Sequence, residues 1–190
     1  MPEKVYSPAE DSYLVAENLE AGDHETVIDI GSGSGLLAIL ASKKAERVFA
    51  IDINPDAALA THENAKRNGV SSKIDTIVGD MFQPFRPSGK FDRVVCNPPY
   101  LPTSDEEMKK NDAVSKAWSA GLDGRLHTKK LLEGVRPYLT ERGSLTLVQS
   151  SLSKGEATIE KLCEMGFRVR SVTRRNFDFE ILFCIVADYA

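Results

Sequence analysis

The chain has 190 residues, of which 42% are hydrophobic and 27% are charged, and its formal net charge is −4. This length and composition predict one globular domain, residues 1–190, with a sizeable core. The acidic balance argues against nucleic acid as a partner. No apolar run approaches the roughly 20 residues that span a bilayer, and the first ten residues do not resemble a signal peptide. These features suit a cytosolic or a nuclear protein, and we expect a cytoplasmic one with no membrane partner.

The cysteines show no metal-binding pattern. Cys96, Cys163 and Cys184 lie far apart, each in an apolar stretch, and none belongs to a CxxC pair. A cysteine in such surroundings usually behaves as a small buried hydrophobe. We expect neither a metal site nor a disulfide.

Short β-like runs alternate with helical runs through most of the chain, which is typical of an α/β fold. The expected strands are residues 26–30, 47–51, 74–78, 92–96 and 144–149, and the expected helices between them are residues 36–44, 55–68 and 126–138. Asn54 and Pro55 give a start signal for the second of these helices, and Asn68 and Gly69 give its stop signal.

The C-terminal region departs from this alternation. A helix at residues 154–165 is followed by a strand at 167–173, a turn, and a last strand at 179–187. Two strands joined without a helix between them pair antiparallel. We predict a seven-stranded, mostly parallel sheet with one antiparallel strand and with helices on both faces.

Residues 98–125 form the least regular segment and follow directly on the fourth expected strand. Connections of this length are usually lids or substrate loops. The carboxyl end of a central strand is also where open α/β sheets bind ligands. We predict that this segment is a substrate loop.

A glycine-rich turn follows the first expected strand. Gly31, Gly33 and Gly35 precede a helix, as expected where the backbone approaches a ligand closely. Such a turn also suits NAD, FAD or a purely structural role. Asp29, just before the glycines, favours a cationic amino-acid group over a pyrophosphate, and the Gly-x-Gly-x-Gly spacing differs from the Gly-x-Gly-x-x-Gly of dinucleotide sites.

Acidic residues end the next two strands. Asp52 follows the glycine turn at the distance where a carboxylate accepts ribose hydroxyls. Asp80 is placed to accept an adenine amino group, and Met81 to pack on the ring. Either NAD or S-adenosylmethionine would explain Asp52, and a loop cap would explain Asp80 alone. Together with Asp29, they predict one cofactor pocket.

The most informative tetrapeptide, Asn97-Pro98-Pro99-Tyr100, ends the fourth strand. Its two prolines remove two successive N–H donors, so the loop is rich in acceptors. The Asn97 side-chain oxygen and the Pro98 carbonyl are suited to accept both hydrogens of a planar NH2 group, and Tyr100 to pack against it. A rigid strand-ending turn is the structural alternative.

These motifs resemble the HemK family of class I methyltransferases, in particular the short archaeal and eukaryotic branch that methylates the glutamine of the GGQ loop in peptide-chain release factors. The resemblance covers nearly the whole chain. It rests on residues 5–12 (Val-Tyr-Ser-Pro-Ala-Glu-Asp-Ser), 29–35, 52–55 and 97–100, and on Ala117-Trp118 followed by Gly121 and Asp123-Gly124-Arg125.

The resemblance implies a Rossmann-like fold, S-adenosyl-L-methionine as cofactor, S-adenosyl-L-homocysteine as product, and an N-terminal helical segment at residues 1–20 that covers the cofactor. It implies that the cofactor is bound by Ser12, Asp29, Gly31, Gly33, Asp52, Asp80, Met81 and Asn97. It implies that the substrate is bound by Asn97, Pro98, Pro99 and Tyr100, and that the catalytic residues are Asn97, Pro98 and Tyr100. Gly121 and Gly124 would let the substrate loop close, and Trp118 is left out of the catalytic set.

The resemblance also implies a partner. Bacterial members carry an additional helical domain before the catalytic one, and this chain begins almost at the catalytic fold. We expect a heterodimer with a small zinc-ribbon activator subunit, paired with the exposed edge of the strand at residues 74–78.

Two alternatives stay open. Adenine-N6 methyltransferases acting on DNA or RNA share the Asn-Pro-Pro-Tyr loop, because adenine also presents a planar conjugated NH2 group. Some methyltransferase folds are inactive scaffolds. A basic cluster, Arg168, Arg170, Arg174 and Arg175, is either a nucleic-acid stripe or a solvated face.

Overall fold

The computed structural model describes residues 5–88, 90–104 and 119–189, and these form one α/β unit around a single sheet. The seven strands have the order β3-β2-β1-β4-β5-β7-β6. They are β1 (Thr26–Ile30), β2 (Arg47–Asp52), β3 (Ile74–Val78), β4 (Phe91–Cys96), β5 (Leu139–Ser150), β6 (Phe167–Asn176) and β7 (Ile181–Tyr189).

The predicted topology is confirmed. Strands β1 to β5 pair parallel with one another, whereas β7 is antiparallel to both β5 and β6. The sheet is therefore mostly parallel with one reversed strand, as the missing helix between the last two strands predicts. As expected, β3 lies at one edge, and β6 lies at the other.

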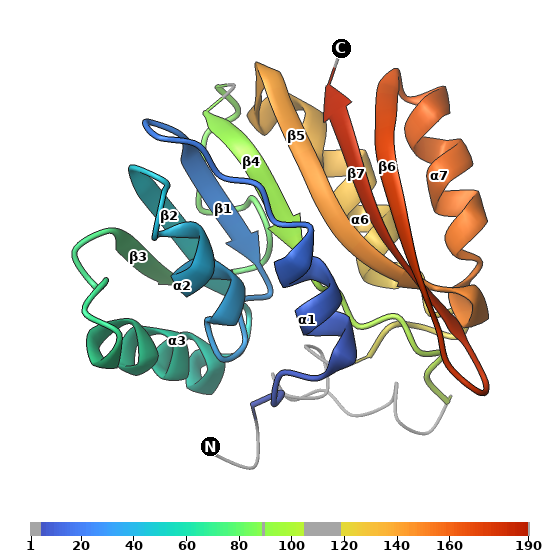
Figure 1. Cartoon of the computed structure of the whole chain (residues 1–190), viewed down its shortest axis with the longest axis horizontal. Helices are drawn as coiled ribbons and strands as arrows, with labels where there is room; N and C mark the ends of the chain where they lie inside the picture. The colour runs from blue at the N-terminus through green and yellow to red at the C-terminus, as the bar shows by residue number, and fades with distance from the viewer. Residues whose placement is uncertain (1–4, 89, 105–118, 190) are drawn as a thin grey trace.

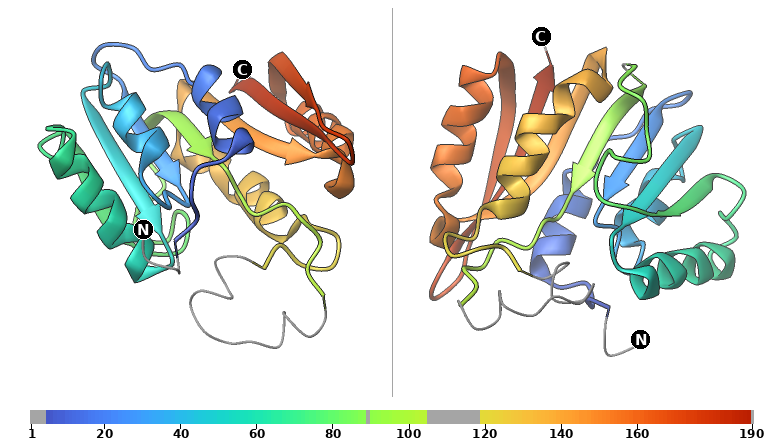
Figure 2. Two further views of the ribbon diagram at one scale, coloured as in Figure 1. Left: turned by 60° about the horizontal axis from the view of Figure 1, so that its bottom comes forward. Right: turned by 180° about the vertical axis from the view of Figure 1, so that it is seen from behind.

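Helices cover both faces of the sheet (Figures 1 and 2). Apolar residues of α1 (Glu10–Glu17), α2 (Leu36–Ala41) and α3 (Pro55–Arg67) pack on one face. Those of α6 (Leu126–Val135) and α7 (Gly155–Glu164) pack on the other. Strand residues alternate between the two cores, as a pleated strand requires: Val27 faces the first group of helices, and Ile28 faces the second.

Several expected boundaries are wrong by a few residues. Strand β5 begins at Leu139 rather than at residue 144, because Leu139 pairs with Phe91 before a register shift. Strand β7 begins at Ile181 rather than at residue 179, because the Phe177 N–H donates to the Glu180 carbonyl across a turn. The helix expected at 126–138 ends at Val135 and continues as the 3-10 turn η1 (Arg136–Tyr138).

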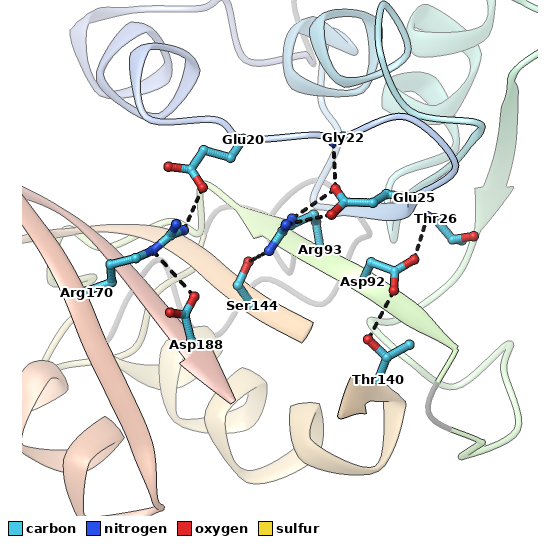
Figure 3. Close-up of polar contacts among 10 residues, drawn as sticks. All are labelled: Glu20, Gly22, Glu25, Thr26, Asp92, Arg93, Thr140, Ser144, Arg170 and Asp188. Atoms are coloured by element: carbon cyan, nitrogen blue, oxygen red, sulfur yellow. Dashed lines mark hydrogen bonds and ion pairs between the residues drawn. The ribbon is translucent and has the colours of Figure 1, made fainter. Parts of the chain in front are cut away.

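Polar contacts tie the amino ends of the central strands together (Figure 3). Arg93 on β4 donates to both carboxylate oxygens of Glu25, at 3.0 and 2.6 Å, and to the Ser144 hydroxyl at 2.9 Å. The neighbouring Asp92 accepts from the Thr26 N–H and from the Thr140 hydroxyl. This network braces the end of the sheet opposite to the pocket described below. Among the described helices, none is long and apolar enough to cross a membrane.

Candidate active site

A cavity of about 300 Å³ opens at the carboxyl ends of β1, β2, β3 and β4. Every residue that the sequence predicts for the site lines this cavity except Asp29; those present are Ser12, Gly31, Gly33, Asp52, Asp80, Met81, Asn97, Pro98, Pro99 and Tyr100. Parallel strands bring all of these residues except Ser12 together, because the carboxyl ends of the strands point to the same edge of the sheet; Ser12 comes from α1.

The glycine turn forms the wall next to β1. Gly31, Gly33 and Gly35 have φ values of 74°, 55° and 82°, a region that L side chains rarely adopt. A Cβ at Gly31 would meet nothing within 4 Å, whereas a Cβ at Gly35 would lie 3.0 Å from the Thr61 side chain. Gly31 therefore leaves open space beside the cavity, and Gly35 permits close packing of α3.

Asp52 holds the loops that surround the cavity. Its Oδ2 accepts from the Gly33 N–H at 2.9 Å, and its Oδ1 accepts from the Asn54 N–H at 2.8 Å. Burial raises the pKa of Asp52, and these two hydrogen bonds oppose that rise. Each oxygen keeps a further lone pair for a ligand hydroxyl.

Asp80 and Met81 supply the wall after β3. Asp80 accepts from the Lys130 ammonium group of α6 and, at 3.4 Å, from Gln83. Met81 is buried and has a φ of 50°, in the left-handed region, and both Asp80 and Met81 line the cavity. The third strand thus ends in an acceptor next to an apolar side chain, as predicted.

The Asn-Pro-Pro-Tyr loop is fixed by the N-terminal segment. Asn97 donates through Nδ2 to the Ser12 hydroxyl oxygen at 3.1 Å, and the Tyr100 hydroxyl donates to Asp11 at 3.3 Å. Because the two polar atoms of an amide lie on opposite sides, donation by Nδ2 turns Oδ1 of Asn97 away from Ser12. That oxygen and the proline carbonyls give the loop its acceptors.

Comparison with known proteins finds methyltransferases. A family model described as ribosomal protein L11 methyltransferase (PrmA) matches residues 13–98. A Methanocaldococcus jannaschii protein named putative protein N5-glutamine methyltransferase is 40% identical over 97% of this chain and 91% of its own length. Mouse methyltransferase HEMK2 is 35% identical over 94% of this chain and 86% of its own.

The chain belongs to the HemK family of methyltransferases. Its fold is that of class I members. The solved E. cuniculi Mtq2–Trm112 complex, described as methylating the translation termination factor eRF1, contains a chain that superposes with a TM-score of 0.73, at 22% identity, over 98% of this chain and 99% of that one.

In this HemK-family chain Asp29 lies behind the cavity wall rather than in it. It is 1% exposed and faces α2, where its Oδ2 accepts from the Ala38 N–H at 3.0 Å. Its Oδ1 is buried and has no hydrogen-bond partner among the described residues. Burial raises the pKa of Asp29 to about 7, the Ala38 N–H opposes that rise, and the charge of Asp52 adds to it.

The prediction missed Tyr6 and Asp11, which also line the cavity. Asp11 is 5% exposed and accepts from the Tyr6 hydroxyl, the Tyr100 hydroxyl and both the N–H and hydroxyl of Ser12. Both residues belong to the motif at residues 5–12, so a signal was present, but nothing in the sequence shows that Asp11 reaches Tyr100.

Gly124 packs directly on the Asn-Pro-Pro-Tyr loop. A Cβ built on it would lie 2.2 Å from the Tyr100 carbonyl oxygen and 2.9 Å from Ser153. The adjacent Arg125 is buried and donates to the carbonyls of Ser153 and Lys154. The described end of the predicted substrate loop is thus anchored against the site. Trp118 and the rest of residues 105–118 lie outside the described residues.

Proposed function

We propose that this chain transfers the methyl group of S-adenosyl-L-methionine to the side-chain amide nitrogen of the GGQ glutamine in a peptide-chain release factor. The observation that carries the proposal is the loop at residues 97–100, held at the mouth of a cavity with acidic residues at successive strand ends. The name of the archaeal relative, a putative protein N5-glutamine methyltransferase, agrees with this chemistry.

The residues of the cavity fit this cofactor. Gly31 leaves room for a ligand against the backbone, and the carboxylates of Asp52 and Asp80 match ribose hydroxyls and an adenine amino group. Asp29 lies behind the cavity wall, so we assign it the role of holding the start of α2 through the Ala38 N–H rather than a contact with the cofactor. We propose that Ser12, Gly33, Met81 and Asn97 complete the site.

The cofactor supplies an electrophilic methyl group on a sulfonium, and S-adenosyl-L-homocysteine is its product. An amide nitrogen is a poor nucleophile because its lone pair is conjugated, so its orientation is the main contribution left to the protein. Oδ1 of Asn97 and the Pro98 carbonyl accept the two amide hydrogens, while Pro99 and Tyr100 confine the planar group. One amide proton is released to water as the N–CH3 bond forms.

The basic cluster favours a protein substrate over nucleic acid. Arg168 pairs with Asp188, Arg170 with Glu20 and Asp188, and Arg175 with Glu10 and Glu17. These ion pairs reduce the positive potential that a phosphate backbone would require. The cluster is therefore better explained as a brace between β6 and the N-terminal segment.

A panel of methyl acceptors tests the proposal. The chain is incubated with the methyl-labelled cofactor and, in parallel, a release factor, total RNA or DNA, each with and without a zinc-ribbon subunit. We expect label in the release factor alone. If adenine in RNA or DNA is labelled and the release factor is not, the chain is an adenine-N6 methyltransferase and the proposal is wrong.

We also propose that the zinc-ribbon subunit pairs with the edge strand β3, within a cytoplasmic heterodimer. β3 lies at the sheet edge, and Val78 at its end is 55% exposed. An open edge and an exposed apolar side chain favour β-strand addition. Val78→Glu should abolish co-purification, whereas Leu59→Glu, an exposed residue on α3, should not. Charging Ile77 is a less clean test because Ile77 packs against the core.

A further inference from the structure

One buried carboxylate joins three parts of the chain that meet at the mouth of the cavity. The Asp11 oxygens accept from the Tyr6 hydroxyl at 3.0 Å, from the Tyr100 hydroxyl at 3.3 Å and from the Ser12 hydroxyl at 3.2 Å. Tyr6 belongs to the segment before α1, and Tyr100 ends the Asn-Pro-Pro-Tyr loop. Asp11 therefore links the N-terminal segment to the loop that we propose binds substrate.

This arrangement determines which atoms of the loop are donors and which are acceptors. Ser12 gives its hydroxyl hydrogen to Asp11, so its lone pairs are left to accept from Nδ2 of Asn97. If the Asn97 amide were reversed, its Oδ1 would face the Ser12 hydroxyl oxygen, whose hydrogen is already donated to Asp11, and the two oxygens would repel. Asp11 thus acts through Ser12 to keep Oδ1 of Asn97 on the side available to substrate.

The same carboxylate keeps Tyr100 in place as a hydrogen-bond donor. Burial, and then the charges of Asp11 and Glu180, raise the pKa of Tyr100 above its ordinary value, and burial and Asp11 do the same for Tyr6. Both phenols therefore stay protonated at neutral pH and donate to Asp11. A hydrogen bond to a charged acceptor is stronger than one between neutral groups, so a single carboxylate orders both rings.

We infer that Asp11 is a positioning residue for methyl transfer, which holds Tyr100 directly and Asn97 through Ser12. This inference rests on the proposed function for its catalytic consequence, but the positioning itself is a property of the fold. Asp11 acts through these neighbours and is not assigned a contact with the reacting atoms.

The edge strand β6, at the opposite side of the sheet from β3, holds α1 and therefore Asp11. On β6, Arg175 contacts Glu10 at 3.2 Å and Glu17 at 2.7 Å, and the Thr173 hydroxyl donates to Asn18 at 2.6 Å. Arg170 contacts Glu20 at 2.6 Å (Figure 3). Glu10 and Glu17 are the first and last residues of α1, and Asn18 and Glu20 follow it, so β6 holds both ends of the helix that carries Asp11.

Substitution of Asp11 tests the inference by kinetics. Asp11→Ala should lower kcat by about tenfold or more, the size expected when a hydrogen bond to a charged group is lost. Asp11→Asn, which keeps one acceptor oxygen, should recover part of that loss. In a Tyr100→Phe background the Asp11→Ala substitution should have a smaller effect, because residues that act through one contact are not additive.

Asp92→Asn is the matched control. Asp92 also bridges separate strands by accepting from an N–H and a hydroxyl, but at the opposite end of the sheet (Figure 3). We expect Asp92→Asn to lower thermal stability and to leave kcat unchanged. If Asp11→Ala lowers stability to the same extent and also leaves kcat unchanged, Asp11 has only a structural role and the inference is overturned.

Hydrogen exchange separates this inference from the proposed function. In Asp11→Ala the amides of Asn97 and Tyr100 should exchange about tenfold faster, and in Asp11→Asn they should exchange faster by a smaller factor, while those of Thr146 and Leu147 in β5 keep their rates. Unchanged exchange at Asn97 and Tyr100 in a folded Asp11→Asn protein would overturn the inference. If the wild-type chain methylates no release factor, the proposed function fails, and hydrogen exchange still decides the role of Asp11.

Discussion

Gly124 offers a test of the proposed substrate loop because its place in the structure allows no side chain. The Cβ of Gly124→Ala would lie 2.2 Å from the Tyr100 carbonyl oxygen, and a Cβ essentially never comes closer than 3.0 Å to a heavy atom. The backbones of Tyr100 and Gly124 must therefore separate by about 0.8 Å, since the atom in collision is a backbone oxygen and not the end of a flexible side chain. Gly124 also has a φ of 68°, which strains alanine by about 1–2 kcal/mol.

Displacement of Tyr100 should damage transfer more than it damages the fold. A misplacement of this size near the reacting groups reduces a rate by on the order of a hundredfold. We expect Gly124→Ala to lower kcat by that amount, with a much smaller change in the dissociation constant for S-adenosyl-L-methionine. Steady-state methyl transfer and calorimetric cofactor binding measure the two quantities separately.

Gly69→Ala is the control for Gly124→Ala. Gly69 follows α3, has a φ of 70°, and a Cβ built there would meet nothing within 4 Å. Gly69→Ala therefore introduces the same backbone strain without a steric collision. It should lower the free energy of unfolding by about 1–2 kcal/mol and leave kcat unchanged. If the two alanine variants have the same kcat, contact between Gly124 and Tyr100 does not position the loop.

Three further outcomes follow from the cavity. Gly31→Ala should weaken cofactor binding more than it destabilises the fold, because its Cβ enters open space beside the cavity; equal losses in a binding titration and in thermal unfolding would contradict this. Between about pH 4 and 7 the folded state keeps a proton on Asp29 that the unfolded state releases, so the unfolding free energy should fall by up to about 1.4 kcal/mol per pH unit as pH rises. Asp29→Asn should flatten that slope in urea unfolding. Lys130→Ala should change stability by less than about 1 kcal/mol, because the Lys130–Asp80 pair is partly exposed and screened; a larger loss would show that α6 depends on it.

The sheet was predictable because its strands are short apolar runs separated by helical periods and clear turn signals. The single reversed strand followed from the missing helix after β6. The boundaries of β5 were less predictable, since the residues before Ser144 join the sheet only through the non-local pairing of Leu139 with Phe91. Tertiary packing determines where such a strand begins, and the β propensities of the individual residues do not contain that information.

The site was predictable where each residue ends a strand, because parallel strands deliver their carboxyl ends to one place. Asp29 shows the limit of that argument. Its side chain points from β1 toward α2. Side chains alternate along a strand, so this direction could be predicted only if the face of the sheet that α2 covers were already known.

Contacts between distant residues were not predictable. Asp11 and Tyr100 are 89 positions apart, and Arg175 and Glu17 are 158 apart. Their residue types are also common on solvated surfaces, so neither pair stands out in the sequence. Composition left the arginine cluster open as a nucleic-acid stripe or a solvated face. In the structure Arg168, Arg170 and Arg175 pair with acidic side chains, and Arg175 does so with Glu10 and Glu17 of α1.

Fragmentation mass spectrometry of the release-factor peptide tests the central claim most directly. The peptide that contains the GGQ glutamine is isolated after incubation with S-adenosyl-L-methionine and either the wild-type chain or Asn97→Ala, both shown beforehand to bind the cofactor. We predict one added methyl group on the glutamine side-chain nitrogen with the wild-type chain and none with Asn97→Ala. Full methylation by Asn97→Ala, or a methyl group on another residue of the peptide, would contradict the account.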